Sequence, residues 1–180
     1  MIAAITVRVS GRAKLQVAGG LRNDEAVADA LSSGAARVVV GTAALEQPEF
    51  AGRLVERHGA DRIAVALDIR DGLAIGRGWV PGTPGTPVLD ALDRLDRAGV
   101  RTFVVTAIAR DGLLDGPDLE LLGRAIAATS GQVIASGGVS SIADLEACRD
   151  HGAIGAIVGR AIYTGAIDLP AAIERLSQEP

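Results

Sequence analysis

The sequence predicts an α/β fold in which about six βα units form an incomplete (βα)8 barrel. Three observations favour this fold. Glycines close a series of helical patterns, an uninterrupted apolar run follows each of them, and a late segment of the chain repeats an early one. Apolar runs that do not alternate with polar residues are typical of strands buried on both faces of a parallel sheet.

The predicted strands are short and rich in β-branched residues. In chain order they are 14–18 (KLQVA), 37–41 (RVVVG), 62–68 (RIAVALD), 101–107 (RTFVVTA), 132–136 (QVIAS) and 154–159 (IGAIVG). A glycine that we expect to end a helix precedes each strand after the first: Gly34, Gly59, Gly99, Gly131 and Gly152. Glycine adopts the left-handed backbone of a helix end without steric cost.

The segments between these strands are predicted to be amphipathic helices. Apolar residues recur at helical spacing at Val88, Leu89, Leu92 and Leu95, and again at Leu121, Leu122, Ala125 and Ile126. Ser141 and Asp144 have the spacing of a capping box. The Pro/Gly-rich segment 80–87 (VPGTPGTP) is expected to be a loop inside one unit. We therefore expect residues 1–180 to form one truncated barrel domain.

An internal repeat favours a barrel over a doubly wound sheet. Residues 15–45 resemble residues 133–163 at one offset of 118 residues, which aligns Gly19-Gly20 with Gly137-Gly138. Gly34 and Gly152 are also 118 residues apart and are separated by four units. Four units are half of a (βα)8 barrel, which typically needs ~250 residues. We therefore expect an eight-unit barrel without its first two units.

The composition limits the partners and the location. A net charge of −4 argues against nonspecific binding of nucleic acid. One cysteine, Cys148, excludes a disulfide within the chain and is typical of a reducing cytoplasm. No apolar run approaches the ~20 residues that a membrane span needs. The expected protein is cytoplasmic, with neither a membrane nor a nucleic acid as partner.

Glycines after the strands predict two phosphate sites. In such barrels the loops that follow the strands carry the chemistry. Paired glycines let the backbone approach a ligand, and the next helix N-terminus offers free N–H groups to an anion. The candidate residues are Gly19, Gly20, Gly41 and Thr42 for one site and Gly137, Gly138, Gly159 and Arg160 for the other. Tight βα turns are the alternative interpretation. Two related sites imply a ligand phosphorylated at both ends, or two inorganic phosphates.

Two carboxylates lie between these glycines along the chain. Asp68 ends an apolar strand, and Asp111 lies in the loop after another, where partial desolvation can favour proton transfer. Asp111-Gly112 is also a common turn sequence. Thr106 ends the strand before Asp111 and is a candidate ligand contact, although threonine is also frequent in strands.

Other polar and aromatic residues have less specific patterns. Arg77 and Trp79 could clamp a carboxylate or stack on a ring, and packing is the alternative for the tryptophan. His58 and His151 each precede a helix-ending glycine, so we expect exposed caps without a metal or catalytic role. Cys148 is expected to pack in a helix. No metal and no cofactor is predicted.

Seven motifs in order resemble the phosphoribosyl isomerase family of histidine biosynthesis, especially its actinobacterial bifunctional branch, which also serves tryptophan biosynthesis. They are VAGGLRNDEA (17–26), VGTAALEQPE (40–49), ALDIRDG (66–72), GRGW (76–79), DGLLDGP (111–117), VIASGGVSS (133–141) and AIVGRAIY (156–163). The resemblance implies strands 3–8 of a TIM-type barrel and an Amadori rearrangement of a phosphoribosyl aminal to an aminoketose, without a cofactor.

The resemblance also implies roles for individual residues. Asp111 corresponds to the general acid that assists ring opening, and Asp68 and Thr106 correspond to residues that hold the sugar. Arg77 and Trp79 match the segment that folds over substrate, and Arg22 is assigned to substrate binding. The glycine pairs, with Gly41-Thr42 and Gly159-Arg160, match the two phosphate sites.

Two departures from the family modify this expectation. The family usually has an acid where this chain has Ala107. Its general base lies on the first strand, which the 118-residue offset places about fifty residues before Met1. We expect a phosphosugar-binding chain with low isomerase activity alone, which forms a homo-oligomer or needs a complementing chain. The alternatives are a noncatalytic phosphosugar-binding or assembly protein and an unrelated phosphosugar enzyme that uses Asp68 with Asp111.

Overall fold

The computed structural model describes residues 1–180 except 10, 77–78, 81 and 178–180. Within these residues, one curled sheet contains six parallel strands in chain order. They are β1 (Gln16–Ala18), β2 (Arg37–Val40), β3 (Ile63–Arg70), β6 (Thr102–Ala107), β7 (Gln132–Ser136) and β8 (Gly155–Ile157). Two further strands, β4 (Leu73–Ile75) and β5 (Thr86–Pro87), extend the sheet from β3 as antiparallel neighbours. The predicted α/β class and parallel strand order are confirmed.

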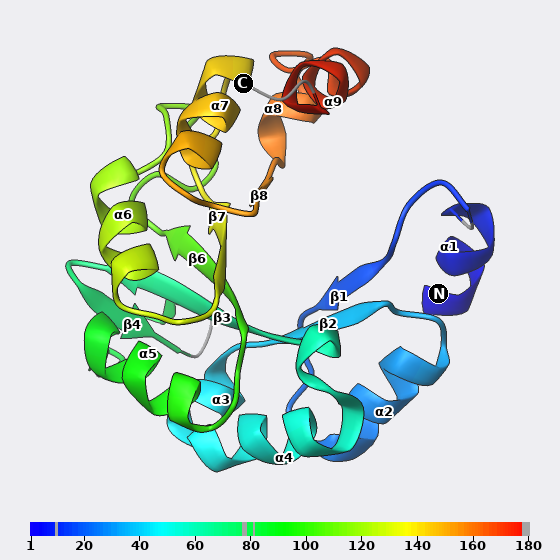
Figure 1. Cartoon of the computed structure of the whole chain (residues 1–180), viewed down its shortest axis with the longest axis vertical. Helices are drawn as coiled ribbons and strands as arrows, with labels where there is room; N and C mark the ends of the chain where they lie inside the picture. The colour runs from blue at the N-terminus through cyan, green and yellow to red at the C-terminus, as the bar shows by residue number, and fades with distance from the viewer. Residues whose placement is uncertain (10, 77–78, 81, 178–180) are drawn as a thin grey trace.

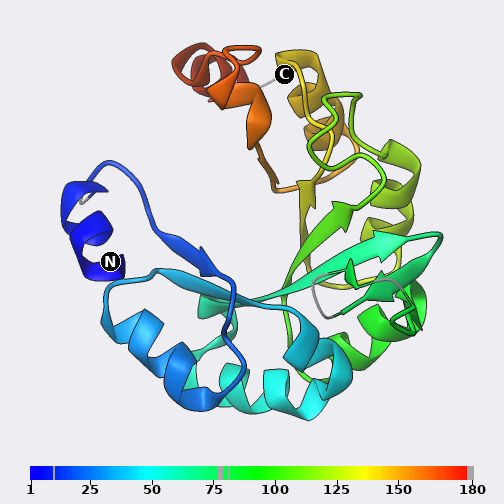
Figure 2. The same ribbon diagram turned by 180° about the vertical axis from the view of Figure 1, so that it is seen from behind.

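The helices are α1 (Ile2–Val9), α2 (Asp24–Ser32), α3 (Thr42–Glu46), α4 (Pro48–His58), α5 (Val88–Arg97), α6 (Leu119–Ala127), α7 (Ile142–Asp150), α8 (Arg160–Tyr163) and α9 (Leu169–Ser177), with a short 3-10 turn at Ala60–Arg62. Helices α2, α4, α5, α6 and α7 cover the convex side of the sheet, whereas α1 and α9 lie at the two ends of the curled sheet, beside its opening (Figure 1). Figure 2 shows from behind that β1 and β8 lie on opposite sides of a wide opening. The sheet is thus an incomplete barrel. No helix in the described part of the chain is both long and apolar enough to cross a membrane.

Both faces of the sheet carry a buried apolar cluster, and the two clusters differ in size. The main core lies between the sheet and the helices and includes large buried side chains such as Leu67 and Phe103. A smaller cluster on the other face of the strands consists of Val39, Ala64, Val104 and Ile134. Because side chains alternate between faces along a strand, Asp68 and Thr106 project on the same face as this second cluster. The concave face therefore carries the polar strand ends.

Four of the five predicted helix-ending glycines have the expected backbone. Gly34, Gly59, Gly99 and Gly152 all have φ between 89° and 100°. The prediction for Gly131 is wrong, because α6 already ends at Ala127 and Gly131 is absent from the positive-φ residues. A Cβ on Gly131 would lie 2.8 Å from Phe103 Cε2 and 3.0 Å from the carbonyl oxygen of Arg101. This glycine is required for space rather than for its dihedral angles.

The N-terminal cap of α7 forms as the sequence predicts. The Ser141 hydroxyl accepts the Asp144 backbone N–H at 3.2 Å, and the Asp144 carboxylate accepts the Ser141 N–H at 3.0 Å. The predicted capping box is therefore present. In contrast, the segment predicted as a loop at 80–87 ends in β5, which pairs with β4 at Leu73 and Ala74.

Candidate functional site

The parallel register aligns four residues at the carboxyl ends of neighbouring strands. Asp68 on β3 pairs with Thr106 on β6, Thr106 pairs with Ser136 on β7, and Ser136 pairs with Ile157 on β8. We call these four residues the strand-end row. Asp68 and Thr106 were predicted site residues, whereas Ser136 was missed. Its position directly before Gly137-Gly138 at the end of a strand was the signal that could have identified it.

A first cavity of about 450 Å³ is lined by all four residues of this row. Its lining includes the predicted residues Gly19, Gly20, Arg22, Gly41, Thr42, Asp68 and Thr106, together with Ser136 and Ile157. The loops after β1 and β2 thus meet the carboxyl ends of β3 and β6. The structure brings together the glycines of one predicted phosphate site and the residues predicted to hold the sugar.

A second cavity of about 240 Å³ is lined by two residues of the row. Its lining includes Asp111, Gly112, Gly137, Gly138, Gly159 and Arg160, and again Ser136 and Ile157. The other predicted phosphate residues therefore gather around the predicted acid. Because Ser136 and Ile157 line both cavities, the two cavities are neighbours on the concave face.

A larger cavity of about 680 Å³ lies outside the concave face. It extends from Arg22 and Thr42 to Phe50 and Arg53, between α2 and α4. The Arg53 guanidinium lies 5.8 Å from the centre of the Phe50 ring and forms a 4.0 Å ion pair with Asp24. We assign the candidate site to the two cavities of the concave face, because the first is lined by all four residues of the strand-end row and the second by Ser136 and Ile157.

The two glycine pairs match in sequence but differ in their surroundings. A Cβ built on Gly19 or Gly20 meets no atom within 4 Å. In contrast, a Cβ on Gly138 would overlap the carbonyl oxygen of Gly116, and one on Gly137 would lie 2.8 Å from the Ala107 oxygen. Open space above Gly19-Gly20 leaves the backbone accessible to a ligand. At Gly137-Gly138 the glycines are also needed for close packing of neighbouring loops.

Trp79 contacts Asp68 directly. Its indole Nε1–H donates a 2.8 Å hydrogen bond to Asp68 Oδ2. Trp79 is partly exposed and has φ 66°, a backbone conformation that is unusual for a bulky residue. The tryptophan therefore lies at the polar strand end and not in the core. Arg77, predicted to act with Trp79, lies outside the described residues.

Asp111 lies in an exposed turn and also lines the second cavity, so the turn interpretation and a position at the site are compatible. Its backbone N–H donates to the Ile108 oxygen at 3.3 Å, and Gly112 has φ 70°. Ala107 is buried in the core on the helix side of the sheet, opposite the strand-end row. The side chain of an acid at this position would therefore project from the face of the sheet that points away from the first cavity.

The histidines and the cysteine lie away from both cavities. His151 is exposed as predicted, and its Nδ1 lies 2.8 Å from the Ala147 oxygen. The prediction that His58 is exposed is wrong, because its Nε2 is buried without a hydrogen-bond partner. Burial and the charges of Arg57 and Arg62 lower the pKa of His58.

Cys148 is buried, as expected for a packing residue. Burial and the nearby Asp144 charge raise the pKa of its thiol to about 11. A thiol with this pKa is a poor nucleophile near neutral pH. Across the described ranges, no group of three or more His, Cys, Asp or Glu side chains could hold a metal ion.

Comparison with known proteins agrees with this arrangement of motifs. A family model described as histidine biosynthesis protein matches residues 1–168. Over 164 residues the chain is 47% identical to a protein of Arthrobacter sp. strain FB24, covering 89% of this chain and 65% of that relative. That relative is named as the isomerase of an imidazole-4-carboxamide with two phosphoribosyl groups.

A relative of Brevibacillus brevis with the same name is 45% identical over 165 residues, covering 90% of this chain and 66% of the relative. Phosphoribosyl isomerase A of Streptomyces coelicolor is 47% identical over 167 residues, covering 91% of this chain and 68% of that protein. The first relatives thus extend well beyond the part that this chain matches. The chain belongs to the histidine biosynthesis protein family, among sequences named as phosphoribosyl isomerases.

Proposed function

We propose that the protein is a phosphoribosyl isomerase that binds a doubly phosphorylated phosphoribosyl aminal and supports its Amadori rearrangement. The observation that carries this proposal is the pair of neighbouring glycine-lined cavities that share Ser136 and Ile157. Each cavity combines a glycine pair with a carboxylate, Asp68 in the first and Asp111 in the second. The relatives named as isomerases of a compound with two phosphoribosyl groups support the same substrate class.

In this proposal backbone N–H groups of the glycine loops bind the two phosphates. Asp111 donates a proton to the ring oxygen as the sugar ring opens, and Asp68 and Thr106 hold the sugar between the phosphates. The indole of Trp79 donates to one oxygen of Asp68, and among the described residues no other side chain donates to this carboxylate, so its second oxygen can accept from a sugar hydroxyl.

The resemblance places the general base on a strand that residues 1–180 do not contain. Loss of a general base commonly costs on the order of 10²–10⁴-fold in rate. We therefore expect residues 1–180 alone to bind inorganic phosphate and to turn over the isomerase substrate slowly. A rate equal to that of a full-length relative would show that another residue within 1–180 acts as the base.

The Asp111→Asn variant tests the assignment of the acid. We expect it to abolish the residual turnover and to leave the dissociation constant for inorganic phosphate unchanged within about twofold, because the amide keeps the shape of the carboxylate. Asp61→Asn is the control, because Asp61 is exposed in the turn before β3, at the opposite end of that strand from Asp68. Loss of phosphate binding in Asp111→Asn would instead assign Asp111 a structural role in the turn.

The second candidate is a noncatalytic phosphosugar-binding protein, and the position of Ala107 favours it. An apolar residue occupies the place where the resemblance implies an acid, and its side chain faces the helix side of the core. Such a protein would bind the doubly phosphorylated substrate without converting it, whether or not Asp111 is replaced. Assays with the histidine-pathway substrate and with phosphoribosylanthranilate, the tryptophan-pathway substrate of the bifunctional branch, distinguish the two candidates.

A further inference from the structure

We propose that Arg160 is a positioning residue that holds the Asp111 turn at the edge of the second cavity. Arg160 is the first residue of α8, and its Nη1 donates a 2.8 Å hydrogen bond to the carbonyl oxygen of Gly112. This bond joins the loop after β6 to the helix after β8. The inference deepens the proposed function, because Asp111 is the residue to which that function assigns the proton transfer.

The loop that carries Asp111 is fixed at both ends by its neighbours. Near its start, the Ile108 N–H donates to the oxygen of Ile69 on β3 at 3.0 Å. Near its end, the Gly116 N–H donates to the oxygen of Gly138 at 3.1 Å. These two bonds anchor the loop on both sides of its tip. Neither bond involves the tip itself.

The tip, residues 111–113, is held mainly within its own loop, where Arg110 Nη1 also donates to the backbone oxygen and to the carboxylate of Asp115 at 3.0 Å each. The N–H groups of Asp111 and Leu113 donate within the loop, to Ile108 and Arg110. All three tip residues are exposed. Among the residues that the structure describes, the bond from Arg160 is the only hydrogen bond that another element makes to this tip. The position of the tip relative to the second cavity therefore depends on Arg160.

This orientation matters because Asp111 and Arg160 line the same cavity. Gly112 has φ 70°, and glycine permits many alternative backbone conformations once a restraint is lost. A displacement of about 1 Å in a reacting group can cost on the order of 10²-fold in rate. An arginine has five N–H donors, so Arg160 can hold Gly112 and still offer donors to a phosphate. The two roles are separable by a measurement on the ligand-free chain, where only the bond to Gly112 is present.

The test compares Arg160→Met, which keeps length but removes every donor, with Arg160→Lys, which keeps a charge and a donor. Arg124→Met on the exposed face of α6 is the matched control. The first readout is the NMR order parameter of the Gly112 amide in the ligand-free chain, which is ~0.85 for rigid backbone and below ~0.6 for flexible backbone. We expect Arg160→Met to lower it, Arg160→Lys to restore most of it, and the control to leave it unchanged.

The second readout is catalytic. We expect Arg160→Met to lower kcat by about 10- to 100-fold with a smaller change in KM, and Arg160→Lys to recover much of the loss. An unchanged Gly112 order parameter in Arg160→Met would overturn the inference, and weaker phosphate binding alone would then assign Arg160 solely to the anion. A wild-type chain without any turnover would overturn the proposed function and not the inference, because the order parameter is measured without substrate.

Discussion

The indole of Trp79 and the carboxylate of Asp68 are joined by a hydrogen bond of 2.8 Å. The bond links the segment after β4 to the carboxyl end of β3, where Asp68 begins the strand-end row. Trp79 is the single tryptophan of the chain, so its fluorescence reports this contact without a label. The first prediction uses that signal.

Replacing Asp68 with alanine removes the acceptor of the indole N–H. We expect the emission of Trp79 to move to longer wavelength and its quenching by acrylamide to increase, because the ring loses its only hydrogen-bonded anchor among the described residues. Asp61→Ala, at an exposed position in the turn before β3, is the control. Identical spectra for the wild type and Asp68→Ala would contradict the contact.

The two glycine pairs should respond differently to alanine. Gly20→Ala meets open space, so we expect only the cost of a left-handed alanine, about 1–2 kcal/mol, together with weaker phosphate binding in the first cavity. Gly138→Ala carries the same backbone cost and also overlaps Gly116, which should add about 1–3 kcal/mol. Urea denaturation of both variants measures the difference. Equal losses would mean that the Gly116 loop moves aside freely.

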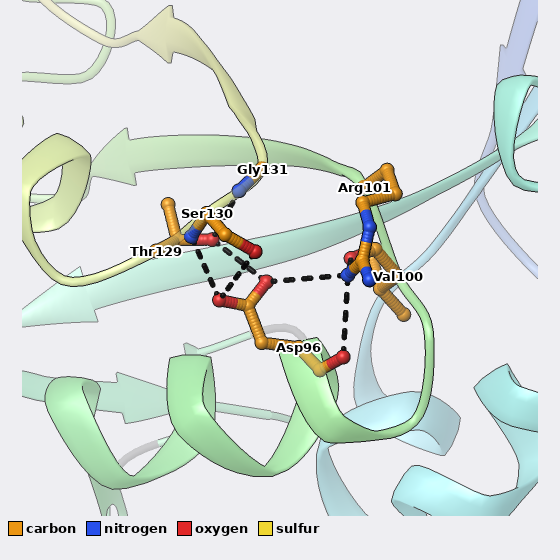
Figure 3. Close-up of polar contacts among 6 residues, drawn as sticks. All are labelled: Asp96, Val100, Arg101, Thr129, Ser130 and Gly131. Atoms are coloured by element: carbon orange, nitrogen blue, oxygen red, sulfur yellow. Dashed lines mark hydrogen bonds and ion pairs between the residues drawn. The ribbon is translucent and has the colours of Figure 1, made fainter.

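Asp96 organises a polar cluster (Figure 3), which lies before the starts of β6 and β7 and thus at the opposite end of these strands from the strand-end row. Its carboxylate accepts hydrogen bonds from Thr129 Oγ1 at 2.8 Å and from the Ser130 N–H at 2.9 Å, and Arg101 lies 3.9 Å from it. Asp96→Ala leaves these donors without their partner, so we expect a loss of about 1–3 kcal/mol in the free energy of unfolding.

Asp93 on the same helix is the control for Asp96. It forms a surface pair with Arg97 at 3.0 Å, with both side chains more than half exposed. We expect Asp93→Ala to cost no more than about 0.5 kcal/mol, as is usual for exposed i,i+4 pairs. Thermal unfolding of both variants is the measurement, and comparable losses would show that the Asp96 cluster is no more stabilising than a surface pair.

The capping box of α7 should make stability depend on pH. Burial alone would raise the pKa of Asp144, but hydrogen bonds from Ser140 and Ser141 outweigh it and hold the pKa below its usual value. Because the folded state binds fewer protons, this contribution is present above the unfolded pKa and is lost as the pH falls through the folded pKa. Urea unfolding between neutral pH and pH ~3 should show a smaller loss in Asp144→Asn than in the wild type.

The open edges of the sheet predict self-association. Within the described residues β1 and β8 each pair on one side only, and Gln16, Ala18 and Ile157 are exposed there. Unpaired edge strands recruit partners. We expect a homodimer or higher oligomer in sedimentation at micromolar concentration. A compact monomer that binds no hydrophobic dye would contradict this prediction.

The strand pattern could be predicted because the signal is local. Runs such as 132–136 are apolar on both faces, and that property is carried by the run itself. Gly131 was misinterpreted because a glycine needed for space, here beside Phe103, looks in sequence like one that ends a helix. Only the packed structure distinguishes the two.

The candidate site was less accessible to sequence reasoning than the strands. Ser136 enters the strand-end row through its register with Thr106, and register between strands is a long-range property. The contact between Trp79 and Asp68 likewise depends on how the chain returns after β4. The glycine pairs could be located because repetition at a fixed offset marks equivalent positions, although the repeat did not show that their surroundings differ.

The two cavities are neighbours that share Ser136 and Ile157, and this has a consequence for affinity. A ligand that reaches both cavities makes its second contact intramolecularly, at an effective concentration in the range of ~1 mM or more for a short linker. Two individually weak anion contacts then combine into tight binding, provided that the ligand is long enough to reach both cavities. The separation between the cavities would thus select ligands by the distance between their two phosphate groups, and a compound with one phosphate would gain nothing from the second cavity.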